Sequence, residues 1–510
     1  MKNILKGNKA MMKTDVYRDK VLACWLGKCL GGNLGMLYEG CEGPLDLKHD
    51  AVQKVSMPND DLELQMLWLW LIEKHGATLR SGDFAHAWDK WYQADYDEYG
   101  VARWNIRRGL KPPLTGLHNN WFTDGMGAVI RSEIWACLFP GKPDLAAAFA
   151  REDACVDHAG DGVWAEVFLA AAGSHAFVSG DLEKVIDEGL VRIPGNSRVT
   201  QVVRFVGELW QRKIPVGLAR EEILKKFGSH NFTDVCMNLG FIMLGLWYGQ
   251  GEFEKSVLIA VNCGMDADCT AATTAAMLGI LLGSKGISAS WRNSVDDNLV
   301  YSSFLKELPL PQTIDEAVER TFVMAERLSG LPPDKPLDNT TPVITHDNIN
   351  DDRQWFIVCS FLGEDFSVDP EIIKQAQAEP SRFPKNLVTF SGIHMDLSPF
   401  IEHGGDTLYL LTWLEAERDM QAQLMTCVGK TGITAWLDGR MIVNYHGRRK
   451  AVPALHRVEG GAVVPVEFRA GRRHLLKIRL LFCCKPLMLS VALADEQSRY
   501  LDGIKFCVKC

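Results

Sequence analysis

The sequence has few of the features that would place a chain in a membrane or on nucleic acid. Its longest apolar segments are interrupted by Lys28 or by Asp266 and Asp268, which excludes ordinary membrane spans. It has no basic run or arginine-rich patch, and its formal net charge is -9, so we expect no nucleic-acid partner. Residues 1–13 carry scattered lysines without the apolar run of a signal peptide, and we expect no such peptide.

A disulfide framework is also missing from the sequence. The 14 cysteines have no compact spacing, and many lie in apolar helical surroundings, as Cys24 and Cys137 do. Reduced thiols and a cytoplasmic location are therefore expected. The pair Cys507 and Cys510 forms a single CxxC, which is weak evidence for a zinc site without a second ligand pair.

The sequence is rich in helical periodicity over its first two thirds. Its 510 residues, 47% of them hydrophobic, are enough for two or three domains. Apolar stripes with helical spacing occur at residues 62–72, 166–177, 199–210 and 238–248. We predict one large all-α domain over residues 15–330, with its helices packed around a cleft.

The pattern changes after this domain. Residues 331–352 are rich in Pro, Asn and Thr, which predicts a linker. From residue 353 onward the apolar period becomes two, with strands expected near 408–413, 434–437, 441–443, 463–468 and 474–480. We therefore predict an all-β, jelly-roll-like sandwich domain over residues 353–510.

The role of this second domain stays open at the level of sequence. The Trp436-Leu-Asp-Gly439 segment resembles the galactose-binding-like sandwiches that accompany carbohydrate-active enzymes. A structural lid or an oligomer contact is an equal alternative, because a fold does not establish a binding activity. The sequence does not give the oligomeric state.

Two pairs of aspartates stand at predicted helix starts. Asp266 and Asp268 follow Gly264 and precede a helix of small residues, while Asp60 and Asp61 open a strongly apolar helix after Asn59. Uncompensated carboxylates in apolar surroundings repel one another and are poorly solvated, so a hard divalent cation is an economical partner. Helix capping is the alternative explanation for each pair taken alone.

The order of these motifs resembles the ADP-ribosylglycohydrolase family. Its members have an N-terminal Thr-Asp-Asp and a C-terminal Asp-x-Asp-Thr/Ser, which Asn59–Asp61 and Asp266–Cys269 match. Residues 27–39 resemble the family's opening G-x-x-x-G-D-x-x-G-x-x-Y-E helix, and residues 127–131 resemble its N-G-x-x-M-R loop. The resemblance covers roughly residues 20–330.

The resemblance implies a function and a set of site residues. It implies hydrolysis of a glycosidic bond with Mg²⁺ or Mn²⁺, one or two ions, and a small-molecule glycoside or ADP-ribose-like substrate. The implied metal ligands are Asn59, Asp60, Asp61, Asp266 and Asp268. Glu39 would be the catalytic acid/base. Gly127, Arg131 and His158 would contact the substrate, although Arg131 could equally be an internal ion-pair partner.

Aromatic residues suggest one further substrate contact. Residues 88–121 contain a cluster of Trp and Tyr together with acids, and Trp121 precedes the glycine-rich loop. Aromatic faces stack on sugars and bases, so Trp121 is a predicted substrate contact. Packing in the protein core is the alternative for any single one of these rings.

The sequence departs from the family pattern at four positions. Gly32 replaces an Asp, Asn59 and Cys269 replace hydroxyl ligands, and Met126 replaces the Asn of the glycine-rich loop. A thiol is a poor ligand for Mg²⁺, so the sequence leaves open whether one or two ions bind. Met126 offers no hydrogen bond to a diphosphate, and we therefore expect protein-linked ADP-ribose not to be the preferred substrate.

Two other functions remain at this stage. The altered ligands allow a non-catalytic binder of ADP-ribose-like or carbohydrate ligands. A thiol hydrolase that uses Cys269 with His158 is the other alternative, although the neighbouring acids would suppress the thiolate.

Overall fold

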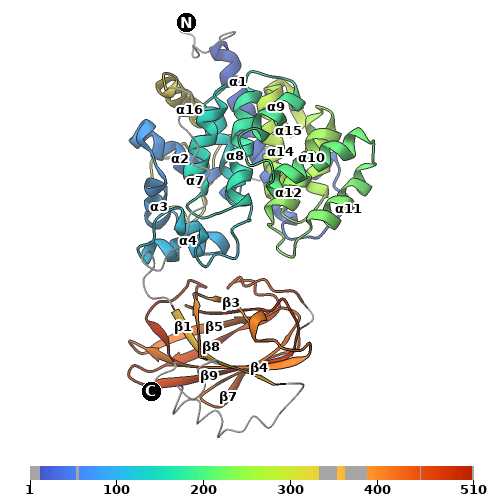
Figure 1. The fold of residues 1–510 in the computed structure, drawn as a ribbon. Coiled ribbons are helices and arrows are strands. Elements are labelled where there is room, and N and C mark those ends of the chain that lie inside the picture. The colour runs from blue at the N-terminus through green and yellow to red at the C-terminus, as the bar shows by residue number, and fades with distance from the viewer. Residues whose placement is uncertain (1–11, 53–56, 332–352, 362–386, 448, 508–510) are drawn as a thin grey trace. The chain divides into compact units, whose positions relative to one another are not determined.

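A computed structural model describes residues 12–52, 57–331, 353–361, 387–447 and 449–507. The chain divides into two compact units, each considered by itself below (Figure 1). The described residues of the first unit fall within 1–93, 111–117 and 122–343, and those of the second within 94–110, 118–121 and 344–510.

The first unit is helical, as the sequence predicts. Its helices are α1 (Thr14–Gly35), α2 (Asp60–His75), α3 (Ser81–Lys90), α5 (Leu114–Leu117), α6 (Ser132–Leu138), α7 (Pro143–Ala154), α8 (Asp161–Ala176), α9 (Leu182–Leu190), α10 (Arg198–Gln211), α11 (Val216–Phe227), α12 (Val235–Gly249), α13 (Phe253–Asn262), α14 (Ala267–Leu282), α15 (Ala289–Arg292) and α16 (Ile314–Leu328), with the 3₁₀ turns η1 (Met36–Tyr38), η2 (His49–Ala51), η3 (Gly76–Thr78), η4 (Val129–Arg131) and η5 (Ser284–Gly286). The four apolar stripes lie in α2, α8, α10 and α12.

The most apolar helices form the centre of this unit. Nearly every residue of α8, α12 and α14 is buried, including residues on opposite sides of each helix. A helix that is apolar around its whole circumference is stable only when other helices surround it. Figure 1 shows these helices in the interior of the helical unit. The polar side chains at their N-terminal ends are therefore held by a well-packed core.

Helices α1 and α14 approach each other along a row of glycines. A Cβ at Gly27, Gly31 or Gly35 would lie 2.5, 2.4 or 2.3 Å from backbone atoms of α14. On the other side, a Cβ at Gly279 would lie 2.2 Å from the Ala23 carbonyl oxygen. The spacing of four residues places the three glycines of α1 on one helix face. This face brings the C-terminal end of α1 against the first turn of α14.

The second unit contains two antiparallel sheets. Its strands are β1 (Arg353–Phe361), β2 (Leu387–Ser391), β3 (His394–Asp396), β4 (Asp406–Ala416), β5 (Met420–Cys427), β6 (Gly432–Leu437), β7 (Arg440–Tyr445), β8 (Gly461–Phe468), β9 (Arg473–Cys483), β10 (Met488–Ala494) and β11 (Ile504–Cys507), with the turn η8 (Ser398–Phe400). One sheet has the order β2-β1-β4-β9-β6-β7 with β11 also paired to β4, and the other has the order β3-β10-β5-β8.

The two sheets share one hydrophobic core. Leu410 of β4 and Ile478 of β9 come from the first sheet, and Leu424 of β5 and Val491 of β10 come from the second. Such inward-facing residues recur at every second position along a strand, which is the alternation that predicts this domain. The β fold is thus confirmed, while its resemblance to galactose-binding-like domains stays a prediction.

Helix α4 (Asp97–Arg107) groups with the β-sheet unit. Trp104 stacks on Tyr500 with ring centroids 5.0 Å apart, and its Nε1 donates to Asp502 Oδ1 at 2.9 Å. Asp97 forms an ion pair with Arg457. The domain boundaries predicted from the sequence divide the chain into consecutive segments, 15–330, 331–352 and 353–510. They therefore assign α4 to the helical domain and do not predict its grouping with the sheets.

Two sequence expectations concern the whole chain. In the part of the chain that the structure describes, none of the helices is long and apolar enough to cross a bilayer. Twelve cysteines of the described residues, among them Cys24 and Cys137, are free thiols, and Cys510 of the CxxC pair lies outside the described residues. The cytoplasmic location stays a prediction.

The α1–α14 contact generates a stability prediction. Gly31→Ala places a methyl group 2.4 Å from the Ala271 carbonyl group, so we expect it to lower the free energy of unfolding by about 1–3 kcal/mol. Gly82→Ala in α3 is the matched control, since a Cβ there meets no atom within 4 Å and the helix propensity of Ala exceeds that of Gly. Urea unfolding followed by circular dichroism measures both, and equal stability of the two variants would contradict the close contact.

Candidate functional site

The first aspartate pair opens α2. Asn59 is its N-cap, and the Asn59 Oδ1 atom accepts a hydrogen bond from the Asp61 backbone N–H at 2.8 Å. The side chain that caps α2 is therefore that of Asn59. Asp61 is fully buried.

The second pair follows a tight turn. Gly264 and Met265 both have positive φ angles, of 73° and 61°, and Met265 exchanges backbone hydrogen bonds with Gly40 and Cys41 at 2.8 and 2.5 Å. Asp266 then stands at the N-cap of α14, but its side chain accepts no capping hydrogen bond. The capping explanation thus fails for the Asp266 side chain.

The two pairs meet although about two hundred residues separate them. Ligand atoms of Asp61, Asp268 and Cys269 all lie within 4.8 Å of one another. Burial, together with the charges of Asp61, Asp268 and Glu63, raises the pKa of Asp60 well above its ordinary value. These carboxylates therefore form one cluster at the adjoining starts of α2 and α14.

The chemistry of this cluster fits a divalent cation. Asp266 Oδ1 and Asp268 Oδ1 are buried and accept no hydrogen bond from the described residues. Burial, followed by the charges of Glu39 and Asp61, raises the pKa of Asp268 to about 7. Buried carboxylate oxygens without hydrogen-bond donors are costly, and a hard cation would compensate them.

Cys269 contributes a protonated thiol to the cluster. Burial, and then the charges of Asp266, Asp268, Asp61 and Asp60, raises the pKa of the Cys269 thiol well above its ordinary value. A thiol nucleophile must ionise, so this environment argues against the thiol hydrolase considered from the sequence.

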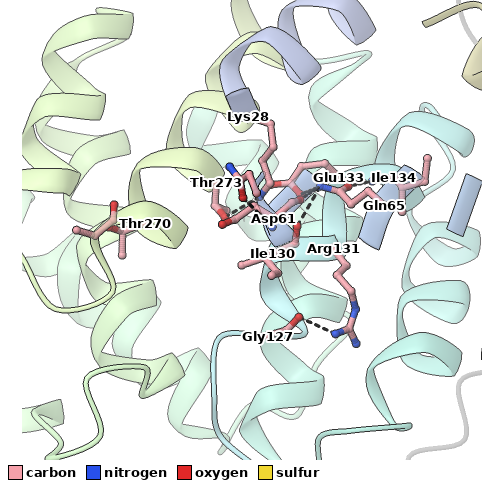
Figure 2. A network of polar contacts seen from close by, with 12 residues as sticks. Lys28, Asp61, Gln65, Gly127, Ile130, Arg131, Glu133, Ile134, Thr270 and Thr273 are labelled. Carbon is pink, nitrogen blue, oxygen red and sulfur yellow. Dashed lines mark hydrogen bonds and ion pairs between the residues drawn. The ribbon is translucent and has the colours of Figure 1, made fainter. Parts of the chain in front are cut away.

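One cation is already present beside the aspartates. The ammonium of Lys28, on α1, is completely buried and lies 3.1 Å from Asp61 Oδ1 and 3.0 Å from Glu133 Oε1. It also donates to Thr273 Oγ1 of α14 at 3.3 Å. Figure 2 shows these side chains pointing toward one another. Burial alone would lower the pKa of Lys28, but the attraction of Glu133 and Asp61 outweighs it and raises the pKa.

Gln65 holds Glu133, one of the two acidic partners of Lys28. Its Nε2 donates to Glu133 Oε2 at 3.0 Å and to the Asp61 carbonyl oxygen at 2.8 Å, and its Oε1 accepts from the Ile134 backbone N–H at 2.7 Å. Sequence reasoning missed Lys28, Gln65 and Glu133 as members of the site. The available signal was a lysine between two packed glycines in an otherwise apolar helix segment.

The side chain of Asn59 packs against Gly32. A Cβ on Gly32 would lie 1.8 Å from Asn59 Nδ2, so the amide side chain of Asn59 fills the volume that any side chain at position 32 would need. The two departures from the family pattern are therefore sterically linked.

Glu39 lies directly after η1 at the exposed end of the α1 segment. Its charge is a contributor to the raised pKa of both Asp266 and Asp268, which places its carboxylate near the cluster. The next residue, Gly40, is bound to the turn that precedes Asp266. Glu39 thus combines exposure to solvent with proximity to the buried acids.

Arg131 is committed to internal contacts. Its guanidinium is fully buried, lies 3.0 Å from Asp153 Oδ1 and 2.9 Å from both Asp157 oxygens, and donates to the Gly127 carbonyl oxygen at 2.7 Å. Each of its three nitrogens donates a hydrogen bond within the protein, which favours the internal ion-pair alternative over substrate contact. Through Gly127, Arg131 fixes the glycine-rich loop.

His158 belongs to the same buried group. Its Nδ1 lies 3.1 Å from Asp157 Oδ1, and its ring lines a cavity of about 240 Å³ together with Gly160 and Trp164. Burial would raise the pKa of Asp157, but Arg131 and His158 outweigh it and lower this pKa to about 2. The substrate role of His158 stays a prediction.

The remaining predicted contacts lie on different parts of the chain. Met126 is buried with 1% of its surface exposed. Trp121 is 37% exposed and groups with the second unit, so its stacking role stays a prediction. The cavity of about 830 Å³ between α11, α13 and η5 is lined by none of the four clustered aspartates.

Comparisons with known proteins agree on the helical part. A family model described as ADP-ribosylglycohydrolase matches residues 13–331. An uncharacterized protein of Archaeoglobus fulgidus is 24% identical over 309 residues, which cover 57% of this chain and 94% of that protein.

Solved structures show weaker similarity. An "ADP-ribosylglycohydrolase-related protein complex" has a TM-score of 0.45 and 17% identity, covering 62% of this chain and 99% of that one. A β-glucosidase of Kluyveromyces marxianus in complex with glucose has a TM-score of 0.22 and 10% identity, covering 31% of this chain and 17% of the glucosidase. Since the family model matches more than half of its length, this chain belongs to the ADP-ribosylglycohydrolase family.

Proposed function

We propose that this protein is a metal-dependent glycohydrolase that cleaves an N- or O-glycosidic bond of a ribosyl, ADP-ribosyl-like or other glycosyl substrate. The convergence of Asp61 and Asp268 supports the proposal, because their ligand atoms lie within 4.8 Å although the chain separates them by about two hundred residues. Family membership supports hydrolysis of a glycosidic bond, and the family generally depends on divalent metal ions.

The aspartates would hold the cation. Asp60 and Asp61 supply oxygens from the start of α2, and Asp266 and Asp268 supply them from the start of α14. A bound Mg²⁺ or Mn²⁺ would orient sugar hydroxyls and polarise a water molecule. Asn59 contributes by capping α2, and this fixes the direction of the first pair.

Glu39 would be the general acid/base. The transition state of glycoside hydrolysis resembles an oxocarbenium ion, so it needs nearby negative charge and a proton for the leaving group. Glu39 is exposed, can exchange protons with solvent and lies close enough to influence Asp266 and Asp268 electrostatically. The buried acids, in contrast, have no comparable access to solvent.

An uncharged glycoside or nucleoside-like compound is the proposed substrate class. The glycine-rich loop has a buried Met126 at the position of the family's Asn, and Arg131 behind it is neutralised by Asp153 and Asp157. A buried phosphate oxygen left without its donor costs about 1–3 kcal/mol, which is roughly ten- to hundredfold in binding. A diphosphate would therefore gain little on this loop.

The β-sheet unit would be an accessory domain in this proposal. We place the catalytic domain at residues 15–330, the linker at 331–352 and the accessory domain at 353–510, with α4 as a helical element that groups with the sheets. Sugar binding, a structural lid and an oligomer contact remain the possible roles of the accessory domain.

The metal site generates the first prediction of function. Asp268→Asn removes a charged ligand, so we expect it to weaken Mn²⁺ binding by tenfold or more and to abolish glycosidase activity, as roughly 1.4 kcal/mol corresponds to tenfold. Calorimetric titration of the chelator-treated protein measures the affinity. Asp187→Asn on the exposed face of α9 is the matched control and should bind Mn²⁺ normally. Unchanged affinity in Asp268→Asn would exclude this residue as a ligand.

Glu39 is tested separately from metal binding. Glu39→Gln keeps the shape but cannot transfer a proton as a carboxylic acid does, so we expect kcat to fall by roughly 10²–10⁴-fold with Mn²⁺ affinity nearly unchanged. Glu42→Gln is the control three residues away, with an equally exposed side chain. Full activity of Glu39→Gln would remove the residue from the mechanism. Ligand binding without turnover by the unmodified protein would support the non-catalytic binder instead.

The substrate class is tested by direct competition. Side-by-side assays of ADP-ribosyl-arginine and ADP-ribosyl-serine peptides against simple ribosides and hexosides should show faster turnover of the simpler compounds. Met126→Asn restores an amide on the loop and is the comparison variant, with its melting temperature measured because position 126 is buried. Efficient turnover of an ADP-ribosylated peptide alone would show that the loop tolerates the diphosphate.

A further inference from the structure

The buried ammonium of Lys28 bears on how many metal ions the site can hold. Its Nζ atom lies 3.1 Å from Asp61 Oδ1, and Asp61 is the residue whose ligand atoms come within 4.8 Å of Asp268 and Cys269. The lysine therefore stands next to the metal-binding carboxylates and not on a remote face of α1.

Lys28 cannot move away from this position. Gly27 before it and Gly31 one turn after it hold the α1 backbone against α14, because an added Cβ would lie 2.5 or 2.4 Å from α14 backbone atoms. The ammonium is also tied to Glu133 at 3.0 Å and to Thr273 at 3.3 Å, and Gln65 holds Glu133 in place. The positive charge is a fixed part of the folded chain.

A fixed ammonium competes with a second metal ion. Ions in two-metal sites lie about 3.5–4 Å apart and share carboxylates between them. The ammonium lies 3.1 Å from Asp61 Oδ1, so a dication held by the same oxygen would meet a like charge in a buried site, where repulsion is strong. The ammonium also occupies the space around Asp61 Oδ1 itself.

The ligands that a second ion would need are missing as well. Gly32 has no side chain, the Asn59 oxygen caps α2, and Cys269 offers sulfur, which is a poor ligand for a hard cation. The space that a side chain at position 32 would fill is taken by the amide nitrogen of Asn59. This nitrogen is a hydrogen-bond donor and not an acceptor, so it cannot serve as a ligand for a cation. The oxygens of Asp60, Asp61, Asp266 and Asp268 remain, which is one compact set of hard ligands.

We propose that this site binds a single divalent cation and that the Lys28 ammonium replaces a second one. The inference rests on the proposed function and deepens it, since it assigns a cation role to a residue of α1. Lys28 would neutralise Asp61 permanently, so only one exchangeable ion is needed to balance the cluster. In this role Lys28 is a positioning residue that fixes Asp61 toward the bound ion.

The test counts metal ions in the intact protein. The chelator-treated chain is titrated with Mn²⁺, and the bound ions are counted by calorimetry and by electron paramagnetic resonance, which reports spin coupling between neighbouring Mn²⁺ ions. We expect one ion per chain without spin coupling. Lys28→Ala removes the charge and releases Asp61 Oδ1 and Glu133 Oε1, the two oxygens that the ammonium contacts at 3.1 and 3.0 Å. These oxygens then supply the ligands that a second ion lacks in the unmodified protein, so this variant should bind two ions with a spin-coupled signal.

Lys20→Ala is the matched control for this experiment. Lys20 also lies on α1, but its Nζ donates to the Ala176 carbonyl oxygen at 2.8 Å and contacts no acid of the cluster. We expect its count to stay at one. Two ions in the unmodified protein would overturn the inference and leave the proposed function intact, whereas no bound ion would refute the metal-dependent function itself. A folded Lys28→Ala protein that still binds one ion with unchanged affinity would also overturn the inference.

Discussion

The close packing of α1 on α14 is the constraint on which the candidate site depends. Gly27, Gly31 and Gly35 allow the two backbones to approach within distances that any side chain would prevent. This approach places the end of α1, and Glu39 after it, beside the turn that carries Asp266 and Asp268. The same helix places Lys28 next to Asp61. Glu39, the pair Asp266 and Asp268, and the Lys28 ammonium are therefore all positioned by one helix pair.

The second constraint is the cost of burying like charges. Asp61, Asp266 and Asp268 are almost completely inaccessible to solvent. Each of them has at least one carboxylate oxygen that accepts no hydrogen bond from the described residues. A protein can tolerate this only if protons, fixed cations or bound ions compensate the charge. Burial and the neighbouring charges of Glu39 and Asp61 accordingly raise the pKa of Asp268. Helix ends that are rigid enough to keep these carboxylates together are thus necessary for binding a cation.

The sequence predicted the fold well because both domains have strong local periodicity. The apolar stripes of α2, α8, α10 and α12 and the alternation in β4, β6 and β9 are properties of short segments. Ordered motifs also predicted the two aspartate pairs. The pairing of Lys28 with Asp61 and Glu133, and the ion pairs that enclose Arg131, join residues far apart in the chain. No local pattern encodes such contacts, so only the structure reveals them.

The contacts of Gly32 and Asn59 show how these two departures from the family pattern are related. A side chain at position 32 would require the Asn59 amide to move, since a Cβ there would lie 1.8 Å from Asn59 Nδ2. Asn59 in turn caps the helix that presents Asp61, and Asp61 pairs with Lys28. Gly32 lacks the carboxylate of the family pattern, and the Lys28 ammonium places a positive charge 3.1 Å from Asp61. A cluster with less negative charge needs fewer bound cations for balance, and both features therefore act on the same electrostatic requirement.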